Sequence, residues 1–377
     1  MTAGPTQAEA AGLLNVDLAA IVANYNVLTH RVLPADCAAV VKADGYGCGI
    51  DQVTAALASA GCKTFFVAQL DEARRVRALA PAAVIYVLNG FPAGTGPALA
   101  QINAQPVINS AVELAEWDQF VTTSGWRGGF ALHVDTGMNR LGLSLDEAAA
   151  MAPRIHSGNH GITLLMSHFA CSDEPANPLN TQQIQRFREI RTLYRGIPAS
   201  LANSSGIYLG PAAHCDLVRP GAALYGINPT PSAKNPMQSV VELRARVLQI
   251  RSVAKGATVG YGATWTAKRD TRLAIVAAGY ADGYLRAASA TEAEPGRQVL
   301  IENLRCPIVG RVSMDLFAVD VTDVPQGAIH RGGLVTLIGG ALGIDEVAAQ
   351  AGTIGYELLT NLGNRYHRTW TNSASQP

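Results

Sequence analysis

Eight short apolar runs alternate with helix-like segments through the first 230 residues, and this alternation limits the fold more than any other feature. The runs are AAVVKADG (38–45), TFFVAQ (64–69), VIYVLNG (84–90), QPVIN (105–109), FALHVDTG (130–137), ITLLMSH (162–168), ASLANSSG (199–206) and LVRPG (217–221). Apolar residues at helical spacing between them mark residues 51–61, 71–80, 111–121 and 181–196. Runs that are apolar throughout indicate strands buried on both faces, as in a parallel sheet. Eight such units predict an α/β fold with an N-terminal (β/α)8 TIM-like barrel.

Polar residues stand at the ends of seven of these runs. They are Lys42, Asn89, Asn109, Asp135, His168, the pair Asn203 and Ser204, and Arg219. In a (β/α)8 barrel the carboxyl ends of the strands meet at one mouth, where active sites are built. Helix capping would account for Ser204 and Asp135, but it does not account for Lys42, His168 and Arg219. We therefore predict a functional site at this mouth.

The pattern changes at NPTPSAKNPMQS (228–239), where three prolines and small polar residues predict a linker. Beyond it the segments are rich in β-formers, with turn residues between them. These segments cover 240–253, 272–280, 298–321 and 333–340. Only residues 344–352 have a clear helical pattern. The expected domains are therefore a barrel over 1–235 and a mainly-β C-terminal domain over 236–377.

Composition excludes several classes of protein. Of 377 residues, 48% are apolar and 15% charged, which gives ample material for a core. Lys and Arg together number 29, as do Asp and Glu, so charge gives no reason to expect nucleic acid or a membrane as partner. The first dozen residues resemble no signal peptide, and six cysteines lack any ligand-like spacing. We expect a cytoplasmic protein with reduced thiols and no metal site.

Lys42 ends the first run and is followed by the glycine-rich sequence ADGYGCG. A lysine inside a barrel mouth is partly desolvated, which lowers its pKa and favours the amine that forms a Schiff base with an aldehyde. Ser204 and the backbone of Gly221 and Ala222 can bind a phosphate at the late barrel strands. A lysine, a phosphate cradle and several tyrosines together suggest pyridoxal phosphate as cofactor.

Nine segments, taken in order, resemble the signature segments of the alanine racemase family. They are VVKADGYGCG, HVDTGMNRLG, LMSHFACSDE, NSSG, LVRPGAALYG, VGYGATW, AAGYADGYLR, VGRVSMD and GYELLTNLGNRYHR. The resemblance spans residues 14–370. It implies a pyridoxal-phosphate barrel followed by a β domain, and the interconversion of L-alanine and D-alanine.

The resemblance implies two catalytic bases. Lys42 resembles the lysine that binds pyridoxal phosphate and serves as base for the D-enantiomer. Tyr261 resembles the opposite base, which serves the L-enantiomer. Two bases are needed because racemisation removes a proton from one face of the α-carbon and returns one to the other. A free tyrosine has a pKa of ~10, and His168 and Arg219 resemble the partners that ease its deprotonation.

The resemblance also implies the binding residues. Arg219 resembles the residue facing the pyridine nitrogen, which an arginine would leave unprotonated. The other residues expected at the cofactor are Tyr46, His168, Asn203, Ser204, Gly221, Ala222 and Tyr356. Arg140, the backbone of Met314, and Tyr284 resemble substrate-binding groups. Asp173 and Arg311 match positions that line the substrate channel.

A homodimer is also implied. Tyr261, Tyr284, Arg311 and Met314 lie in the expected C-terminal domain, and in the family such residues enter the partner subunit's site. A C2 dimer with two composite sites follows from this.

One departure from the family lies at His133, where most members have a lysine that is usually carbamylated and orients the substrate-binding arginine. Arg140 therefore needs another partner. A bound chloride is one option, and neutral His133 itself, accepting a hydrogen bond through its second nitrogen, is the other.

Three alternative functions stay in view. The first is a serine racemase or one of broader specificity. The second is a pyridoxal-phosphate decarboxylase, against which Arg219 argues, because such enzymes keep an acidic partner on the pyridine nitrogen. The third is a non-catalytic cofactor-binding barrel, against which Tyr261 in a complete second domain argues.

Overall fold

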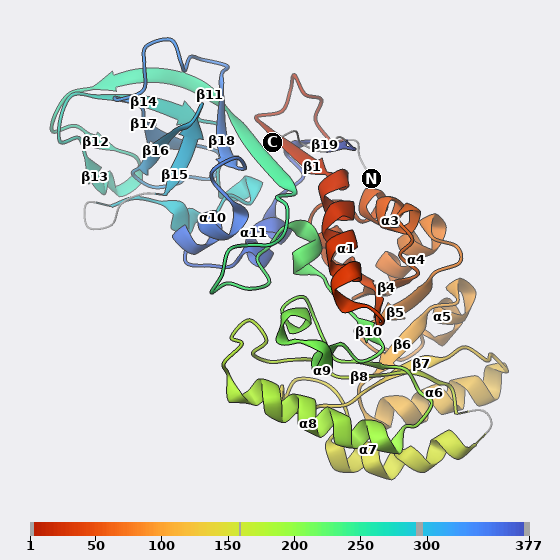
Figure 1. Cartoon of the computed structure of the whole chain (residues 1–377). Coiled ribbons are helices and arrows are strands. Elements are labelled where there is room, and N and C mark those ends of the chain that lie inside the picture. The colour runs from red at the N-terminus through yellow and green to blue at the C-terminus, as the bar shows by residue number, and fades with distance from the viewer. Residues whose placement is uncertain (1–3, 158–159, 292–296, 373–377) are drawn as a thin grey trace. The chain divides into compact units, whose positions relative to one another are not determined.

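The computed structural model describes residues 4–157, 160–291 and 297–372. The chain forms two compact units (Figure 1). One unit consists of residues 21–238, and the other combines residues 1–20 with 239–377.

The first unit is built on parallel strands that lie within the apolar runs. They are β3 (Ala39–Val40), β4 (Thr64–Val67), β5 (Val84–Val87), β6 (Gln105–Ile108), β7 (Phe130–His133), β8 (Ile162–Met166) and β9 (Ala199–Ser200), with β2 (Asp36–Cys37) and β10 (Leu217–Val218). Strands β3 to β9 form a seven-stranded sheet in chain order. Apart from Val84 at the start of β5, their apolar side chains are almost fully buried, as the continuous runs predict.

Strand β10 closes this sheet into a ring. It pairs in parallel with β2, and the Ala38 N–H donates to the Val218 carbonyl at 2.9 Å. On its other side the Arg219 N–H donates to the Ala202 carbonyl, also at 2.9 Å. Backbone hydrogen bonds therefore link the first strand to the last, and the predicted barrel is confirmed.

Helices follow most of the strands. They are α1 (Leu18–Val32), α2 (Lys42–Tyr46), α3 (Ile50–Ser59), α4 (Leu70–Leu79), α5 (Gly96–Ile102), α6 (Ala111–Ser124), α7 (Leu145–Met151), α8 (Pro178–Leu193) and α9 (Pro211–His214), with the short 3-10 helices η1 (Ala152–His156), η2 (Gly206–Leu209) and η3 (Ala222–Tyr225). Figure 1 shows α3 to α8 along the outer side of this unit. Their starts carry side-chain caps where the sequence supplies them: Ser110 Oγ accepts the Glu113 N–H at 3.2 Å.

The second unit is mainly β, as predicted. Its strands are β1 (Gly12–Asp17), β11 (Val241–Val253), β12 (Thr258–Val259), β13 (Trp265–Thr266), β14 (Thr271–Val276), β15 (Gln298–Ile301), β16 (Leu304–Val309), β17 (Phe317–Asp320), β18 (Leu334–Ile338) and β19 (His367–Thr371). The main sheet has the order β14-β17-β16-β15-β18-β11-β1-β19. Strand β14 also pairs with the second half of the long β11, so six of these strands form a closed ring.

Strand β1 comes first in the chain but lies in this second sheet. It pairs antiparallel with β11 and parallel with β19. Gly12 is required there, because a Cβ at this position would come within 2.6 Å of the Tyr366 ring. The helices α10 (Ile344–Gln350) and α11 (Gly355–Asn361) precede β19, and only the first of them has a clear helical pattern in the sequence.

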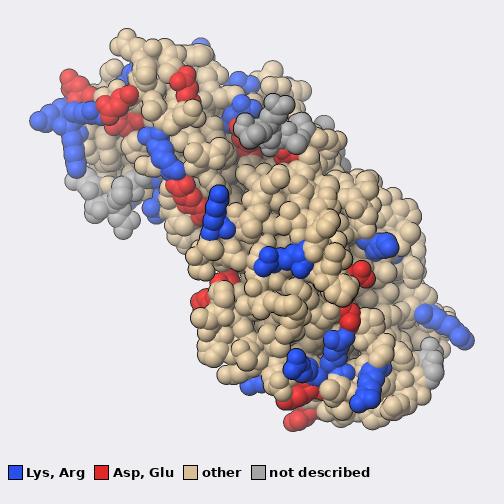
Figure 2. Space-filling model, in the orientation of Figure 1, with Lys and Arg blue, Asp and Glu red and all other residues tan. Residues whose placement is uncertain are grey.

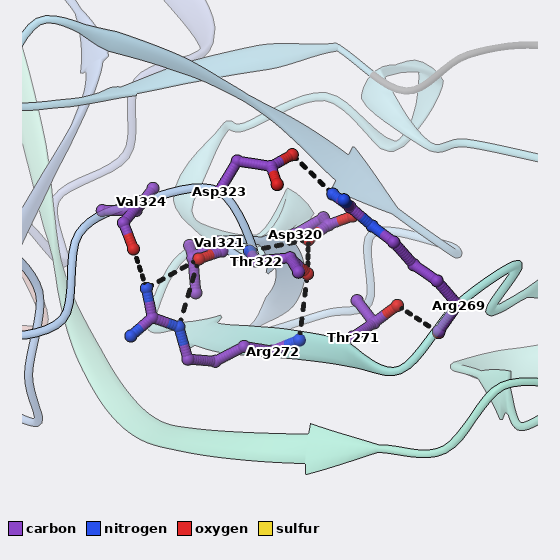
Figure 3. A network of polar contacts seen from close by, with 8 residues as sticks. All are labelled: Arg269, Thr271, Arg272, Asp320, Val321, Thr322, Asp323 and Val324. Carbon is purple, nitrogen blue, oxygen red and sulfur yellow. Dashed lines mark hydrogen bonds and ion pairs between the residues drawn. The ribbon is translucent and has the colours of Figure 1, made fainter.

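A polar network fastens the loop after β17 to the start of β14 (Figure 3). The Arg272 guanidinium donates to the carbonyl of Val321 at 2.9 and 3.1 Å and to that of Val324. Thr322 bonds through its N–H to Asp320 at 2.9 Å and accepts the Arg272 N–H at 3.0 Å. These hydrogen bonds give partners to backbone carbonyl and N–H groups of the turn, which have none within the sheet.

Basic and acidic side chains are interspersed on the face seen in Figure 2, with other residues between them. This agrees with the balanced charge of the sequence. None of the helices in the described ranges is both long enough and apolar enough to cross a membrane.

Candidate active site

The turn after β3 carries Lys42. The residues that follow it have left-handed backbone angles, with φ of 53° at Ala43, 53° at Asp44, 63° at Gly45 and 54° at Tyr46. Such angles cost roughly 1–2 kcal/mol for each residue other than glycine. A strained turn of this kind marks a place where the surrounding structure fixes the backbone.

Lys42 itself is only partly exposed at the barrel mouth. Burial lowers the pKa of its ammonium group, the nearby Arg140 guanidinium lowers it further, and Glu72 opposes both. The neutral amine is therefore more accessible than in a free lysine, which is the form that attacks an aldehyde.

Arg219 follows β10 and is 4% exposed. Its guanidinium donates to the Ser167 carbonyl at 2.6 Å and to Ser200 Oγ. Burial lowers its pKa to about 10. No hydrogen-bond partner of this guanidinium in the described part of the chain is a carboxylate, so Arg219 keeps its positive charge uncompensated at the mouth.

His168 lies beside this arginine, with Arg219 Nη2 3.3 Å from its Nδ1. Arginine has no acceptor, so Nδ1 accepts this hydrogen bond and the ring carries its proton on Nε2. Burial, followed by the positive charge of Arg219, holds the pKa of His168 well below its usual range. A neutral imidazole that donates through Nε2 results.

His133, at the end of β7, has the opposite tautomer. Its Nδ1 lies 2.8 Å from Asn109 Oδ1, while Asn109 Nδ2 donates to the Val107 carbonyl at 2.7 Å. The amide oxygen therefore faces the ring, and Nδ1 must carry the proton. Burial lowers the pKa of His133 to about 4, and Arg219 and Arg140 add to that effect. Its Nε2 is left as a hydrogen-bond acceptor.

Arg140 lies on the loop after β7. Asp135 shapes this loop, because its carboxylate accepts N–H groups from Gly137 and Met138 at 2.8 and 2.9 Å. Arg140 is exposed and makes no hydrogen bond or ion pair within the described ranges. It influences the pKa values of Lys42, His133 and His168, so it belongs to the same mouth.

Ser204, Gly221 and Tyr46 form a small backbone cradle. Ser204 Oγ accepts the N–H groups of Gly221 at 3.0 Å and Ala223 at 3.2 Å. A Cβ at residue 221 would come within 2.3 Å of Tyr46 Oη, so only glycine lets that hydroxyl approach. Ala222, at the start of η3, is 2% exposed. The cradle brings hydroxyl groups and a helix start together, which suits a phosphate.

Two other predicted residues lie on loops of the barrel. Asn203 Oδ1 accepts a hydrogen bond from Ser172 Oγ at 2.8 Å and another from the Gly206 N–H at 2.8 Å, so its side chain braces the Ser204 loop. Asp173 is exposed between β8 and α8.

In the second unit, Tyr261 stands on the 3-10 helix η4 (Tyr261–Ala263) with 74% of its surface exposed. Gly262 has a φ of 73°, and a Cβ there would come within 2.9 Å of the Arg311 guanidinium. Tyr261 and Arg311 therefore come from neighbouring turns of one unit.

The remaining predicted residues also lie in the second unit. Met314 is 54% exposed, and its carbonyl accepts the Ala281 N–H at 3.0 Å. Tyr284 is 1% exposed and stacks on Phe317 at 5.2 Å, and its hydroxyl has no hydrogen-bond partner in the described ranges. Tyr356 is 39% exposed on α11.

The barrel residues fit a cofactor that has an aldehyde and a phosphate. Lys42 supplies an amine of lowered pKa, and the Gly221 cradle brings the hydroxyl groups of Ser204 and Tyr46 together. Arg219 supplies a buried cation without a carboxylate, which can donate to a ring nitrogen. Three cationic side chains at one mouth also favour an anionic ligand.

The sequence interpretation missed one residue that holds the site, Glu72, and gave no specific role to another, Asn109. Glu72 accepts the Ala43 N–H at 2.6 Å, directly after Lys42. No sequence signal points to this contact, because the two residues are 29 positions apart and Glu72 occupies an ordinary helix-start position. Asn109 was noted only as a polar strand end, and its strand position next to His133 was the available signal.

The chain is similar in sequence and in structure to known proteins over nearly its whole length. Residues 16–229 match the family model "Alanine racemase, N-terminal domain", and residues 240–370 match "Alanine racemase, C-terminal domain". An alanine racemase of Methylobacterium nodulans is 52% identical over 363 residues, which covers 96% of each chain. A solved alanine racemase of Bartonella henselae with covalently bound pyridoxal phosphate is 37% identical, with a TM-score of 0.90 over 96% of this chain and 100% of that one. The biosynthetic alanine racemase of Pseudomonas aeruginosa is 38% identical, with a TM-score of 0.88 over 96% of this chain and 99% of that one.

Proposed function

The chain belongs to the alanine racemase family, and on that premise we propose that it interconverts L-alanine and D-alanine with pyridoxal 5′-phosphate as cofactor. The observation that carries this proposal is Lys42, a desolvated lysine of lowered pKa among the cations of the barrel mouth. The similarity to known alanine racemases over nearly the whole chain also supports the proposal.

Residues of the barrel would hold the cofactor. Lys42 would bind it covalently, and Tyr46, Ser204, Gly221 and Ala222 would hold its phosphate, with Tyr356 and Asn203 beside them. Arg219, which lies next to His168, would donate to its ring nitrogen. When bound, pyridoxal phosphate supplies an electron sink that acidifies the α-hydrogen of an attached amino acid.

Two bases exchange the proton. Lys42, as a neutral amine, removes or returns it on one face of the α-carbon, and Tyr261 does so on the other. His168 donates through Nε2 and can stabilise a tyrosinate, and the charge of Arg219 beside it favours that anion. Arg140 binds the substrate carboxylate, and the Met314 backbone borders the substrate. Tyr284, which is 1% exposed and stacked on Phe317, supports this segment from the core of the unit. Asp173 and Arg311 line the channel through which the substrate reaches the site.

We further propose that the enzyme is a homodimer with composite sites. Tyr261, Tyr284, Arg311 and Met314 belong to the unit of residues 1–20 and 239–377, whereas Lys42 belongs to the other unit. In this proposal the second unit of one subunit completes the barrel site of its partner, and C2 symmetry gives two identical sites.

Purified protein tests this proposal. The wild type should have the visible absorbance of lysine-bound pyridoxal phosphate and should racemise alanine. Lys42→Ala should lose that absorbance, because the covalent attachment is gone. Tyr261→Phe should keep the cofactor and lose most turnover. Normal racemisation by Tyr261→Phe would contradict the assignment of Tyr261 as a base.

A racemase that accepts serine or other amino acids is the second candidate, and His133 is the observation that favours it. A histidine there cannot be carbamylated, so the setting of Arg140 differs from that of relatives with a lysine. Assays with alanine, serine, lysine and arginine side by side would decide. Equal turnover of the bulky basic substrates would remove the alanine assignment.

A further inference from the structure

Helix α4 touches the turn that carries Lys42, although none of its residues belongs to the proposed catalytic set. The turn from Ala43 to Gly47 is left-handed. Ala43 and Tyr46 disfavour this conformation, so contacts from outside the turn must maintain it.

Glu72 makes one of these contacts. Its Oε1 accepts the Ala43 N–H at 2.6 Å, while its Oε2 accepts the N–H groups of Ala68 at 2.8 Å and Gln69 at 3.1 Å. Only Oε2 caps the start of α4, whereas Oε1 bonds to the turn that follows Lys42. Glu72 is 9% exposed, so its three hydrogen bonds are shielded from water.

Glu147 shows that a glutamate can cap the start of a helix without a contact such as the one that Glu72 makes with Ala43. Glu147 occupies the same position in α7, where its Oε2 accepts the Ser144 N–H at 2.8 Å. Within the described ranges its carboxylate bonds only to Ser144. Glu72 differs from Glu147 in having one oxygen directed at the residue after Lys42.

Arg75 makes the other contact, one helical turn beyond Glu72 on the same face. Its Nη1 donates to Asp44 Oδ1 at 2.9 Å, and its Nε donates to Asp51 Oδ1 at 2.8 Å. Asp44 Oδ1 also accepts the Ile50 N–H at 3.1 Å. Arg75 therefore links the middle of the left-handed turn to the start of α3.

We propose that Glu72 and Arg75 are positioning residues that hold the left-handed turn of residues 43–47 and so present Lys42 to the cofactor. Glu72 holds the start of the turn by its backbone N–H, and Arg75 holds the middle through Asp44. Neither residue touches the reacting atoms. This inference rests on the proposed function, because it assigns the turn to cofactor attachment.

The test uses the full-length holoenzyme and Glu72→Gln, with Glu147→Gln as matched control. Glutamine keeps the size of the side chain but loses its charge and one acceptor oxygen. The amide hydrogens of residues 43–47 should exchange with solvent about tenfold to a hundredfold faster, as expected for losing a hydrogen bond to a charged group. Pyridoxal phosphate should dissociate about tenfold faster on dialysis, and Glu147→Gln should match the wild type in both measurements.

Arg75→Gln is the second variant, and it should also speed exchange over residues 43–47 and release the cofactor faster. Wild-type exchange and cofactor retention in both folded variants would overturn the inference. Equal losses in Glu147→Gln would also overturn it, because the effect would then be general destabilisation. Neither measurement uses alanine. A wild type that keeps its cofactor but fails to racemise alanine would therefore contradict the proposed function alone.

Discussion

At the scale of single residues, the barrel mouth holds a buried histidine, His133, and a partly buried one, His168, in opposite tautomers. His168 accepts from Arg219 and donates through Nε2, whereas His133 donates to Asn109 and keeps Nε2 as an acceptor. Both are neutral, because burial lowers their pKa values. The mouth can therefore offer a donor toward one group and an acceptor toward another without adding positive charge.

His133 makes the protein less stable in acid. Its pKa is about 4 when folded against 6.5 for a free histidine. Between these pH values the unfolded chain binds a proton that the folded chain does not, so the free energy of unfolding falls as the pH falls from about 6.5 to 4. The loss amounts to about 3 kcal/mol. His133→Gln should reduce this pH dependence in urea unfolding, and His156→Gln, at an exposed site, should leave it unchanged.

Gly221→Ala should weaken cofactor binding without unfolding the barrel. Its Cβ would lie 2.3 Å from Tyr46 Oη, so the phenol must move out of the cradle. We expect about a tenfold loss of pyridoxal phosphate affinity, as for one lost hydrogen bond to a charged group, measured by absorbance titration. Gly343→Ala is the control, because nothing lies within 4 Å of a Cβ there. An unchanged affinity in Gly221→Ala would exclude the cradle as the phosphate site.

The residues of the mouth are visible in the sequence, but their tautomers and supporting contacts are not. Lys42, His168 and Arg219 are visible as polar ends of apolar strands, since the barrel brings such ends together. The tautomer of His133 depends on which atom of the Asn109 amide faces its ring. The amide nitrogen donates to the Val107 carbonyl, so the amide oxygen faces His133. The support from Glu72 depends on a contact between distant segments. Neither has a pattern in the sequence.

At the scale of secondary-structure elements, continuous apolar runs were a reliable signal. Each of the eight runs contains a strand, and the expected helix over 71–80 is found as α4 (Leu70–Leu79). Strand β1 escaped prediction because Asn15 interrupts its apolar sequence, GLLNVD, and its partners β11 and β19 lie more than 200 residues away. Helix α11, GYELLTN, escaped because it begins with a glycine and ends with threonine and asparagine, which are weak helix formers.

The loop after β17 supplies a prediction at this scale. Arg272→Ala removes the guanidinium that bonds the carbonyls of Val321 and Val324 (Figure 3). These carbonyls then lose their partner, and the free energy of unfolding should fall by about 1–3 kcal/mol in chemical denaturation. Arg269→Ala should change it little, because the Arg269–Asp323 pair is exposed. Equal effects of the two variants would contradict this role for the network.

At the scale of the whole molecule, the two proposed bases belong to different compact units, which makes the assembly testable by mixing variants. Lys42→Ala and Tyr261→Phe should each be nearly inactive. If Tyr261 acts in the partner's site, a mixed dimer has one site without either base and one intact site. Random pairing of equal amounts makes half the dimers mixed, so roughly a quarter of wild-type activity should return.

The experiment needs subunit exchange, achieved by unfolding and refolding the mixture, with each variant refolded alone as the control. Only an arrangement in which the two bases of a site come from different subunits restores activity in this way. If both bases of a site came from one chain, every site in every dimer would lack one of them. The refolded mixture would then be no more active than the separate variants, and the composite dimer would be excluded.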